Sequence, residues 1–290
     1  MKIYNLGSVN IDYVYQVDHI VKPGETIASA NMQIFPGGKG LNQSIALARA
    51  GAQVIHGAVL GSDGDFLLRT MEASGVDTSR IAKTEYPSGH AIIQVDKNGQ
   101  NCILLFAGTN HQIDRAYIES FLTDAEKDDI LLLQNETNAL DIAFEVAHQK
   151  QMQIVFNPSP FHTDIKKLPL SYVTWWFCNE IEGAALFGSD NPKEIAKNFT
   201  CQFPDSNLIL TLGTEGSVFI HADTYLEQPI YKVKAVDTTA AGDTFTGYFI
   251  AAVTSGKAVA DALDIAAKAA SITVSRMGAA GSIPKYDEVY

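Results

Sequence analysis

The chain has 290 residues, of which 46% are hydrophobic and 19% charged, and its formal net charge is −12 at pH 7. This composition is typical of a globular protein with one large α/β domain or two small ones, and the negative charge argues against a nucleic-acid or anionic-membrane partner. Three irregularly spaced cysteines indicate neither a disulfide framework nor a zinc site, and no apolar run reaches the length of a membrane span, so we expect a cytoplasmic protein.

Residues 2–9 form a short apolar run that predicts a buried first strand, and polar residues follow it. Asn10 and Asp12 alternate, so both side chains point to one side of the chain. Because ligands of open α/β sheets bind beyond the carboxyl ends of the strands, we expect these two side chains to contact a ligand. The alternative is a simple turn, which Asn and Asp also favour.

Two extended regions, about 13–36 and 88–107, interrupt the alternation of strands and helices. The second contains Asn98-Gly99 between alternating apolar residues, which is a strong signal for a β-hairpin. We therefore predict a small separate sheet, which either covers the site as a lid or presents an edge to a second subunit.

A glycine-rich stretch at 35–43, Phe-Pro-Gly-Gly-Lys-Gly-Leu-Asn-Gln, precedes a predicted helix at 41–50 that Gly51 ends. Its glycines allow close approach of the backbone to a ligand, and Lys39 and Asn42 supply donors. The spacing matches neither the G-x-x-x-x-G-K-[ST] phosphate loop nor G-x-G-x-x-G. A glycine-rich turn without function is the alternative.

The middle of the chain alternates between strands and helices, as expected for βα units. The predicted strands are 54–60, 130–133, 153–157 and 173–177, and the predicted helices between them are 66–74 and 139–149. Glu136, Asn157 and Asn179 follow three of these strands. Each alone is explained by a helix cap or turn, but several polar residues at one edge of a parallel sheet indicate a single site.

The last third contains predicted strands at 208–212 and 217–221, and the turn at 213–216 between them suits either a hairpin or close approach of a nucleotide. Residues 237–245, Asp-Thr-Thr-Ala-Ala-Gly-Asp-Thr-Phe, then open a helix at 244–255, and a second helix follows at 261–276. The small residues leave the first N–H groups of the helix uncovered, which is a favourable seat for a phosphate. Asp243 beside that phosphate suits a general base, so we predict phosphate transfer to a hydroxyl. The alternative is an acid placed only for the helix dipole.

Five motifs identify the family that the chain resembles. They are Gly7-Ser8-Val9-Asn10-Ile11-Asp12, Gly37-Gly38-Lys39-Gly40-Leu41-Asn42-Gln43, Asn179-x-x-Glu182, Thr211-Leu212-Gly213-Thr214-Glu215-Gly216 and the stretch at 237–247. In this order they resemble the ribokinase-like sugar kinases, also called the PfkB carbohydrate kinase family, from residue 2 almost to the C-terminus. The resemblance implies one kinase domain over residues 1–290, with a three-layer α/β/α fold, a mostly parallel central sheet and a small β lid.

The resemblance also implies a role for each matching position. Asp243 would take the proton from the primary hydroxyl of the sugar, and the N–H groups of Ala240, Ala241 and Gly242 would surround the γ-phosphate in flight. The residues implied to bind the sugar are Asn10, Asp12, Gly38, Lys39, Gly40, Asn42, Glu136 and Asp243. Those implied to bind ATP are Asn179, Thr211, Gly213, Thr214, Gly216 and Gly242.

Two kinds of metal ion are implied beside ATP. Asn179 and Glu182 would organise the region of Mg²⁺ and the phosphates, partly through water. Many members of the family are activated by a monovalent cation, so K⁺ is expected as well. The positions that correspond to its site are Asp237, Thr239, Thr273, Arg276, Gly278 and Ser282, several of them through backbone carbonyls.

Within the family, the motifs are most similar to members that phosphorylate D-ribose at O5. No cluster of basic residues indicates a second phosphate on the acceptor. Leu41, Asn135 and Tyr248 depart from the usual pattern and are expected to reshape the sugar pocket, which leaves deoxyribose, another pentose or a ribonucleoside as alternatives. A homodimer through the lid is also expected.

Two other classes of function are weighed against this one. A sugar- or nucleotide-binding regulator without turnover has no need of Asp243 as a base or of the Ala-Ala-Gly anion hole. A nicotinamide-dependent oxidoreductase is disfavoured because no G-x-G-x-x-G follows the first strand.

Overall fold

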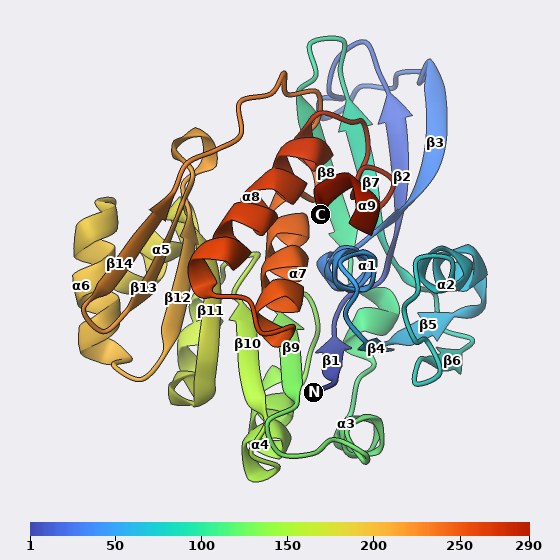
Figure 1. The fold of residues 1–290 in the computed structure, drawn as a ribbon. Helices are drawn as coiled ribbons and strands as arrows, with labels where there is room; N and C mark the ends of the chain where they lie inside the picture. Colours follow the sequence, from blue (N-terminus) through green and yellow to red (C-terminus); the bar gives the residue numbers. More distant parts are fainter.

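The computed structural model describes all residues, 1–290, and an eight-stranded sheet lies at its centre (Figure 1). The strand order is β14-β13-β12-β11-β10-β9-β1-β4. These strands are β1 (Ile3–Leu6), β4 (Val54–Gly57), β9 (Ile130–Gln134), β10 (Gln153–Asn157), β11 (Val173–Asn179), β12 (Asn207–Thr211), β13 (Ser217–His221) and β14 (Thr224–Gln228). The neighbours from β4 to β12 are parallel, and only β13 and β14 pair antiparallel. The predicted, mostly parallel sheet is therefore confirmed.

Helices cover both faces of this sheet (Figure 1). One layer contains α1 (Lys39–Arg49), α2 (Asp65–Glu72), α7 (Ala241–Thr254) and α8 (Val259–Val274), and the other contains α3 (Arg115–Phe121), α4 (Leu140–Gln149), α5 (Glu180–Phe187) and α6 (Pro192–Gln202). Along β9, Ile130 and Leu132 pack into the first layer while Leu131 and Leu133 pack into the second. A strand that is buried on both faces has a continuous apolar sequence, as residues 130–133 of β9 do. No helix is both long enough and apolar enough to span a membrane.

A second sheet stands beyond the main one and is formed by β2 (Asn10–Gln16), β3 (Asn31–Gly37), β7 (Gly89–Val95) and β8 (Asn101–Phe106), in the order β3-β2-β7-β8 (Figure 1). Strands β7 and β8 are antiparallel and are joined by a turn in which Gly99 has φ 79°, which confirms the predicted hairpin. Strand β2 starts at Asn10, directly after the first strand of the main sheet. The chain therefore passes from the main sheet to the second sheet within three residues, between Leu6 and Asn10.

The structure corrects the prediction of a single strand at 54–60. Strand β4 ends at Gly57, and β5 (Val59–Gly61) then leaves the main sheet to pair with β6 (Ala82–Thr84) in a two-stranded parallel sheet. Because both strands are mostly buried, the sequence stays apolar across the break, and the hydrophobic pattern does not show where β4 ends and β5 begins. The first strand is also shorter than predicted, because pairing ends at Leu6.

The C-terminal segment, which ends in α9 (Tyr286–Val289), is fastened to the helices of the first layer. The guanidinium of Arg49 donates to the carbonyl of Ala280 at 3.0 Å and to that of Ile283 at 2.5 Å. The hydroxyl of Tyr248 donates to the carbonyl of Pro284 at 2.8 Å. These contacts tie the segment to α1 and α7, which carry the glycine-rich motif and Asp243.

Candidate active site

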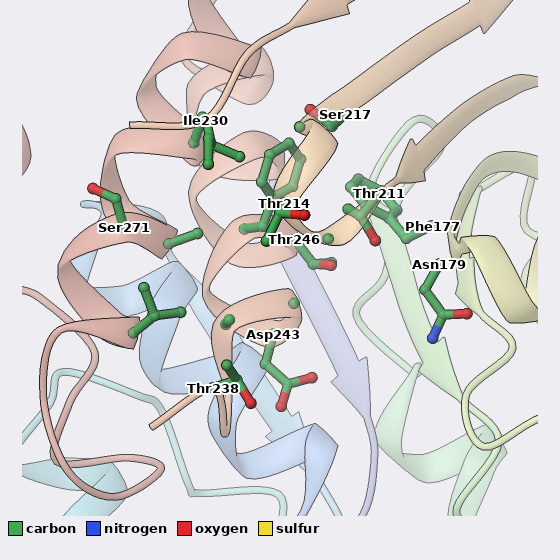
Figure 2. Close-up of a pocket in the computed structure, with 18 of the residues that line it drawn as sticks. Phe177, Asn179, Thr211, Thr214, Ser217, Ile230, Thr238, Asp243, Thr246 and Ser271 are labelled. Atoms are coloured by element: carbon green, nitrogen blue, oxygen red, sulfur yellow. The ribbon is translucent and has the colours of Figure 1, made fainter. Parts of the chain in front are cut away.

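A cavity of about 850 Å³ opens at the carboxyl ends of the parallel strands, where ligands of such sheets bind (Figure 2). Asn157, Asn179 and Thr211, each the last residue of its strand, contribute to its lining. Asp243 lies at the start of α7, while Thr211, Phe177 and Asn179 lie on the other side of the space (Figure 2). Of the residues predicted to bind ATP, all line this cavity: Asn179, Thr211, Gly213, Thr214, Gly216 and Gly242.

The first turn of α7 has the features of an anion site. Ala240, which precedes the helix, has a left-handed backbone with φ 62° and provides no side-chain cap. The N–H of Ala241 donates to the carbonyl of Thr238 at 3.2 Å, whereas the N–H groups of Ala240, Gly242 and Asp243 make no hydrogen bond within the protein. A methyl group placed on Gly242 would meet no atom within 4 Å. Free donors at the positive end of a helix dipole favour a phosphate at this place.

The carboxylate of Asp243 is only 7% exposed and is held by two side chains of α1. The amide of Asn42 donates to its Oδ2 at 3.1 Å, and the amide of Gln43 donates to its Oδ1 at 2.9 Å. A carboxylate has about four acceptor positions, so two remain for a further donor such as a substrate hydroxyl. The Oδ1 of Asn42 is buried and has no partner, so it too is available to a hydroxyl beside Asp243.

Asn10 is oriented by a second asparagine. The amide of Asn110 donates to Oδ1 of Asn10 at 2.7 Å, while its own Oδ1 accepts from the N–H of Val9 at 3.0 Å. Because an amide that accepts through its oxygen must present its NH₂ group elsewhere, Asn10 is left with donors for a ligand. Asn110 therefore fixes which way Asn10 faces.

Glu136 and Lys39 link the first glycine-containing motif to the start of α1. The Oε2 of Glu136 accepts from the hydroxyl of Ser8 and from the backbone N–H of Lys39, the latter at 3.0 Å. Burial alone would lower the pKa of the Lys39 ammonium, but the nearby carboxylates of Asp243, Glu136 and Glu182 outweigh it and raise that pKa. Lys39 is thus a fixed positive charge surrounded by carboxylates.

Asp12 points from β2 into a space that Gly37 leaves open. A methyl group on Gly37 would lie 2.1 Å from the Oδ2 of Asp12, so only glycine allows this carboxylate its position. Burial, followed by repulsion from Glu136, raises the pKa of Asp12 from 3.8 to about 7. A desolvated carboxylate held near another is costly, and it becomes favourable when a ligand donates hydrogen bonds to it.

We expect Asp12 to make the stability of the ligand-free protein depend on pH. Between about pH 4 and pH 7 the folded state binds more protons than the unfolded state, so the free energy of unfolding should fall as the pH rises through this window. Asp12→Asn removes the titration and should raise the Tm at pH 8 by about 3 °C or more, with little change at pH 5. Thermal unfolding across this pH range measures it, with the exposed Asp223→Asn as control. An unchanged pH dependence in Asp12→Asn would refute this account of Asp12.

The residues predicted to organise Mg²⁺ serve first as a helix cap. The Oδ1 of Asn179 accepts from the N–H of Glu182 at 2.8 Å, and the Oε2 of Glu182 accepts from the N–H of Asn179 at 3.0 Å. This capping box starts α5. The second carboxylate oxygen of Glu182 makes no hydrogen bond, and the side chain lines the cavity. The capping box therefore accounts for Asn179 and for one carboxylate oxygen of Glu182, and the other oxygen is left without a partner.

Of the positions predicted for the monovalent cation, Thr239 and Gly278 contact Asp237, whereas the hydroxyl of Thr273 donates to Thr244 and that of Ser282 to the carbonyl of Ala279. The Oδ1 of Asp237 accepts from the hydroxyl and N–H of Thr239, at 2.7 and 2.9 Å, and its Oδ2 accepts from the N–H of Gly278 at 3.0 Å. Burial works to raise the pKa of Asp237, but these three donors outweigh it and lower that pKa. The guanidinium of Arg276 pairs with Glu288 instead, so Arg276 has only its backbone carbonyl to offer a cation.

Two of the three residues expected to reshape the sugar pocket do not line it. Leu41 is fully buried in the core of the first helix layer. On α1, Asn42 and Gln43 face Asp243, while Leu41, one residue earlier, packs into the core. Tyr248 is also fully buried and holds the C-terminal segment. The amide of Asn135 donates to the carbonyl of Pro160 at 2.7 Å.

Sequence reasoning assigned no role to four residues that orient the site. They are Ser8, Gln43, Asn110 and Asn157, and for Asn157 the sequence indicates only a polar residue at the end of a strand. Ser8 and Gln43 lie inside quoted motifs, yet nothing local to the sequence tells which groups they contact. No sequence pattern indicates a role for Asn110, because its partner Asn10 lies 100 residues away in the chain.

Known proteins are similar to this chain over nearly its whole length. The profile of the family described as "pfkB family carbohydrate kinase" matches residues 2–286. A ribokinase of Haemophilus influenzae is 35% identical over 98% of this chain and 95% of its own length. The crystal structure of ribokinase from Cryptococcus neoformans var. grubii in complex with ADP has a TM-score of 0.87 at 32% identity, covering 99% of this chain and 98% of its own. The structure of Arabidopsis thaliana ribokinase complexed with ribose and ATP has a TM-score of 0.89 at 26% identity, covering 99% of this chain and 97% of its own.

Proposed function

This chain belongs to the pfkB family of carbohydrate kinases, and we propose that it transfers the γ-phosphoryl group of ATP to O5 of D-ribose with Asp243 as general base. As a member of that family it is an ATP-dependent phosphotransferase acting on a sugar hydroxyl. Ribose as the acceptor is supported by ribokinases that align with nearly the whole chain. The roles of the residues rest on one observation: the Asp243 carboxylate, the free N–H groups of α7 and the unpartnered oxygen of Asn42 lie together.

In the proposed reaction, Asp243 accepts the proton of the O5 hydroxyl while that oxygen forms a bond to the γ-phosphorus. The bond from the γ-phosphorus to the bridging oxygen breaks, and ADP leaves with the negative charge. Asn42 and Gln43 hold the carboxylate in place through its two oxygens. The proton acceptor is thus fixed before the sugar arrives.

Charge on the moving phosphoryl group needs donors that are already oriented. The N–H groups of Gly242 and Asp243, with that of Ala240, supply them at the positive end of α7. The ammonium of Lys39, kept charged by Asp243, Glu136 and Glu182, adds a positive charge on the same wall of the cavity. These groups compensate for the net negative charge of the protein at the one place where an anion binds.

The oxygen ligands available for Mg²⁺ suit a cation carried mainly by the nucleotide. Glu182 has one carboxylate oxygen free of hydrogen bonds, and no cluster of three or more His, Cys, Asp or Glu side chains surrounds a metal position. Mg²⁺ commonly keeps its waters and binds one carboxylate together with substrate phosphates. We therefore assign Glu182, through water, to Mg²⁺ that neutralises the phosphate oxygens, and Asn179 to holding Glu182.

Recognition of the sugar is assigned to groups whose free atoms match vicinal hydroxyls. Asn10 offers its NH₂ group, Asn42 its Oδ1 and Asp12 a carboxylate that lacks donors. Buried polar groups of this kind reject analogues that lack a hydroxyl, because the group is then left unpaired. The arrangement therefore favours an acceptor with several adjacent hydroxyls.

Activation by K⁺ is proposed from the oxygen donors around Asp237, since carboxylate, hydroxyl and carbonyl oxygens suit an alkali cation. We expect kcat to rise about fivefold or more when K⁺ replaces Na⁺ at equal ionic strength. Asp237→Asn should abolish the difference by removing the charge and loosening Thr239 and Gly278. Initial rates across a K⁺ titration measure this. Equal rates in the two salts for the unmodified protein would remove the cation from the proposal.

The acceptor is tested by release of ADP with ATP, Mg²⁺ and K⁺ across ribose, deoxyribose, fructose, ribonucleosides and fructose 6-phosphate. The proposal predicts a kcat/KM for ribose at least about tenfold above the others, the discrimination that one or two hydroxyl contacts supply. Turnover with a different sugar alone would reject ribose while retaining the kinase. ATP hydrolysis that no acceptor stimulates would reject the acceptor site as a whole.

We propose that the second sheet covers the site as a lid and also forms a homodimer. Strand β8 is an edge strand with both of its faces exposed, and Leu104 on one face is 67% exposed while Ile103 on the other is 56% exposed. An apolar edge of this kind needs a partner. We expect sedimentation equilibrium to give a dimer, and Ile103→Asp or Leu104→Asp to give a monomer. As control, Ile181→Asp alters an exposed residue of α5 and should leave the dimer intact. A monomeric unmodified protein would contradict the assignment.

A cytoplasmic location is proposed as well. The three cysteines are unpaired, which suits a reducing compartment, and ATP as donor is met there.

A further inference from the structure

A chain of buried side-chain amides runs from Asp243 into the protein interior, and the proposed reaction uses only its first member, Gln43. Gln43, Gln134 and Asn5 are each 0% exposed. The Nε2 of Gln43 donates to Oδ1 of Asp243 at 2.9 Å. The Nε2 of Gln134 donates both to Oε1 of Gln43 at 2.8 Å and to Oδ1 of Asn5 at 2.9 Å.

The interior end of this amide chain fixes its direction. The Nδ2 of Asn5 donates to the backbone carbonyl of Gly40 at 2.9 Å and to the hydroxyl of Ser44 at 2.8 Å. A carbonyl oxygen only accepts, so Asn5 must turn its nitrogen toward Gly40 and its oxygen toward Gln134. Gln134 then donates to both neighbours, and Gln43 must turn its oxygen toward Gln134. Its NH₂ group is left to face Asp243.

A second, independent anchor gives the same orientation. The Nδ2 of Asn157 donates to the backbone carbonyl of Phe177 at 2.7 Å, which leaves Oδ1 of Asn157 as the atom that accepts from Gln43, at 3.2 Å. Two backbone carbonyls, reached through different side chains, therefore both require Gln43 to present N–H rather than oxygen to Asp243.

At the other end, an ionised carboxylate can only accept. Every donor–acceptor contact along the amide chain is matched when Asp243 is ionised, and Oε1 of Gln134 is the one oxygen of the chain without a partner. A proton on Oδ1 of Asp243 would instead face the N–H of Gln43. The other charged groups here are Lys39 on α1, which faces Asp243, and Glu136 and Glu182, which face Lys39. None of these belongs to the amide chain.

We propose that Gln43 is a positioning residue for the general base: its N–H, fixed in direction by Asn5, Gln134 and Asn157, donates to Asp243 and holds the carboxylate in one orientation. The proposal rests on the assignment of Asp243 as base. It assigns to the amide beside Asn42 a function in the chemical step rather than in binding the sugar. The effect should therefore appear in kcat and in its pH dependence, and not in KM for the sugar.

The first test is Gln43→Met, which keeps the length of the side chain and removes its hydrogen bonds. At saturating sugar, kcat should fall about 10- to 100-fold, as expected for a lost bond to a charged group. The acidic limb of the kcat–pH profile should move up by about one pH unit, while KM for the sugar stays near its unmodified value. Because Gln134 and Asn157 lose a partner, rates are measured below the Tm of the variant.

The second test is Gln43→Glu, which keeps an oxygen for Gln134 and sets a second carboxyl against Asp243. Two adjacent carboxyls share a proton, so the acidic limb should move up by about two pH units, and much of the activity should return at high pH. A residue that only fills space would not produce this recovery. If Gln43→Met does not fold, the profile of Gln43→Glu decides the question.

Matched controls are Gln153→Met and Gln153→Glu, at the opposite end of β10 from Asn157, where the side chain makes no hydrogen bond. Both should retain the unmodified kcat and profile. Asp243→Asn is run in parallel. Full activity in Asp243→Asn would refute the base and this proposal with it. An inactive Asp243→Asn together with unmodified kcat–pH profiles in Gln43→Met and Gln43→Glu would refute only the role of Gln43.

Discussion

Asp243→Asn is expected to lower kcat by about 10²- to 10⁴-fold, the contribution typical of a positioned general base. Asparagine has nearly the same shape, but its amide does not take the proton of the sugar hydroxyl. The substituted side chain still offers an oxygen to the amide of Gln43, and its NH₂ group, in place of Oδ2, finds an acceptor when the Asn42 amide turns its unpartnered Oδ1 toward it. Binding of ribose, measured by calorimetry, should change little because the loss belongs to the transition state.

The matched control is Asp261→Asn, which alters an exposed acid in the first turn of the neighbouring helix α8. It carries the same change of charge at an equivalent helical position and should leave kcat unaltered. If Asp243→Asn kept the unmodified kcat, Asp243 would be no more than a favourable charge at a helix start, which is the alternative that the sequence left open.

Gly242→Val is expected to lower kcat by about 10²- to 10³-fold, as when an oxyanion-hole donor is lost. The ligand-free structure has room for the new side chain, since a methyl group at Gly242 would meet nothing within 4 Å. The side chain instead occupies the space where the phosphoryl group must approach the free N–H groups. The protein should therefore fold normally and fail in transfer.

Gly281→Val serves as the folding control, because Gly281 is also free of contacts and has no positive φ. The Tm of Gly281→Val gives the change in stability caused by valine at a glycine with open space around it. The Tm of Gly242→Val should be close to that value. Gly242→Ala should have an intermediate kcat. Normal turnover in Gly242→Val would mean that the phosphate binds elsewhere in the cavity.

The strand ends of this fold could be predicted because their signal is local. Apolar strands end in polar residues, and parallel pairing then brings Asn157, Asn179 and Thr211 to one edge of the main sheet, while Asn10 begins the first strand of the second sheet. The anion site at the start of α7 could be predicted for the same reason, since small residues before an acid leave backbone N–H groups free. The break at Ala58 could not be predicted, because burial on both sides of it keeps the sequence apolar.

The support of the base could not be predicted, since it depends on contacts between distant segments. Gln43 and Asp243 are 200 residues apart and meet only because α1 and α7 pack closely. A methyl group on Gly247 would lie 2.4 Å from Cβ of Ala46, so glycine at this position permits the approach. Neither the motif of α1 nor that of α7 alone reveals which side chains then touch.

The proposed sugar and phosphate positions both have their charged and polar groups in place before either substrate binds. The proposed sugar side contains Asp12, whose pKa is raised to about 7 by burial and then by the charge of Glu136, and the proposed phosphate side contains free N–H groups and the Lys39 ammonium. In the proposed site, the Asp12 carboxylate and Oδ1 of Asn42 are acceptors without donors, which sugar hydroxyls would supply. The free N–H groups of α7 are donors without acceptors, which phosphate oxygens would supply.

The most direct test of the central claim identifies the product by phosphorus NMR after incubation with ATP, Mg²⁺, K⁺ and ribose. The account predicts a single sugar phosphate, with its phosphorus coupled to the protons on C5, formed in equal amount to ADP. Phosphate on another ribose oxygen would contradict the assignment of O5 beside Asp243. ADP formed together with inorganic phosphate alone would contradict phosphoryl transfer to the sugar altogether.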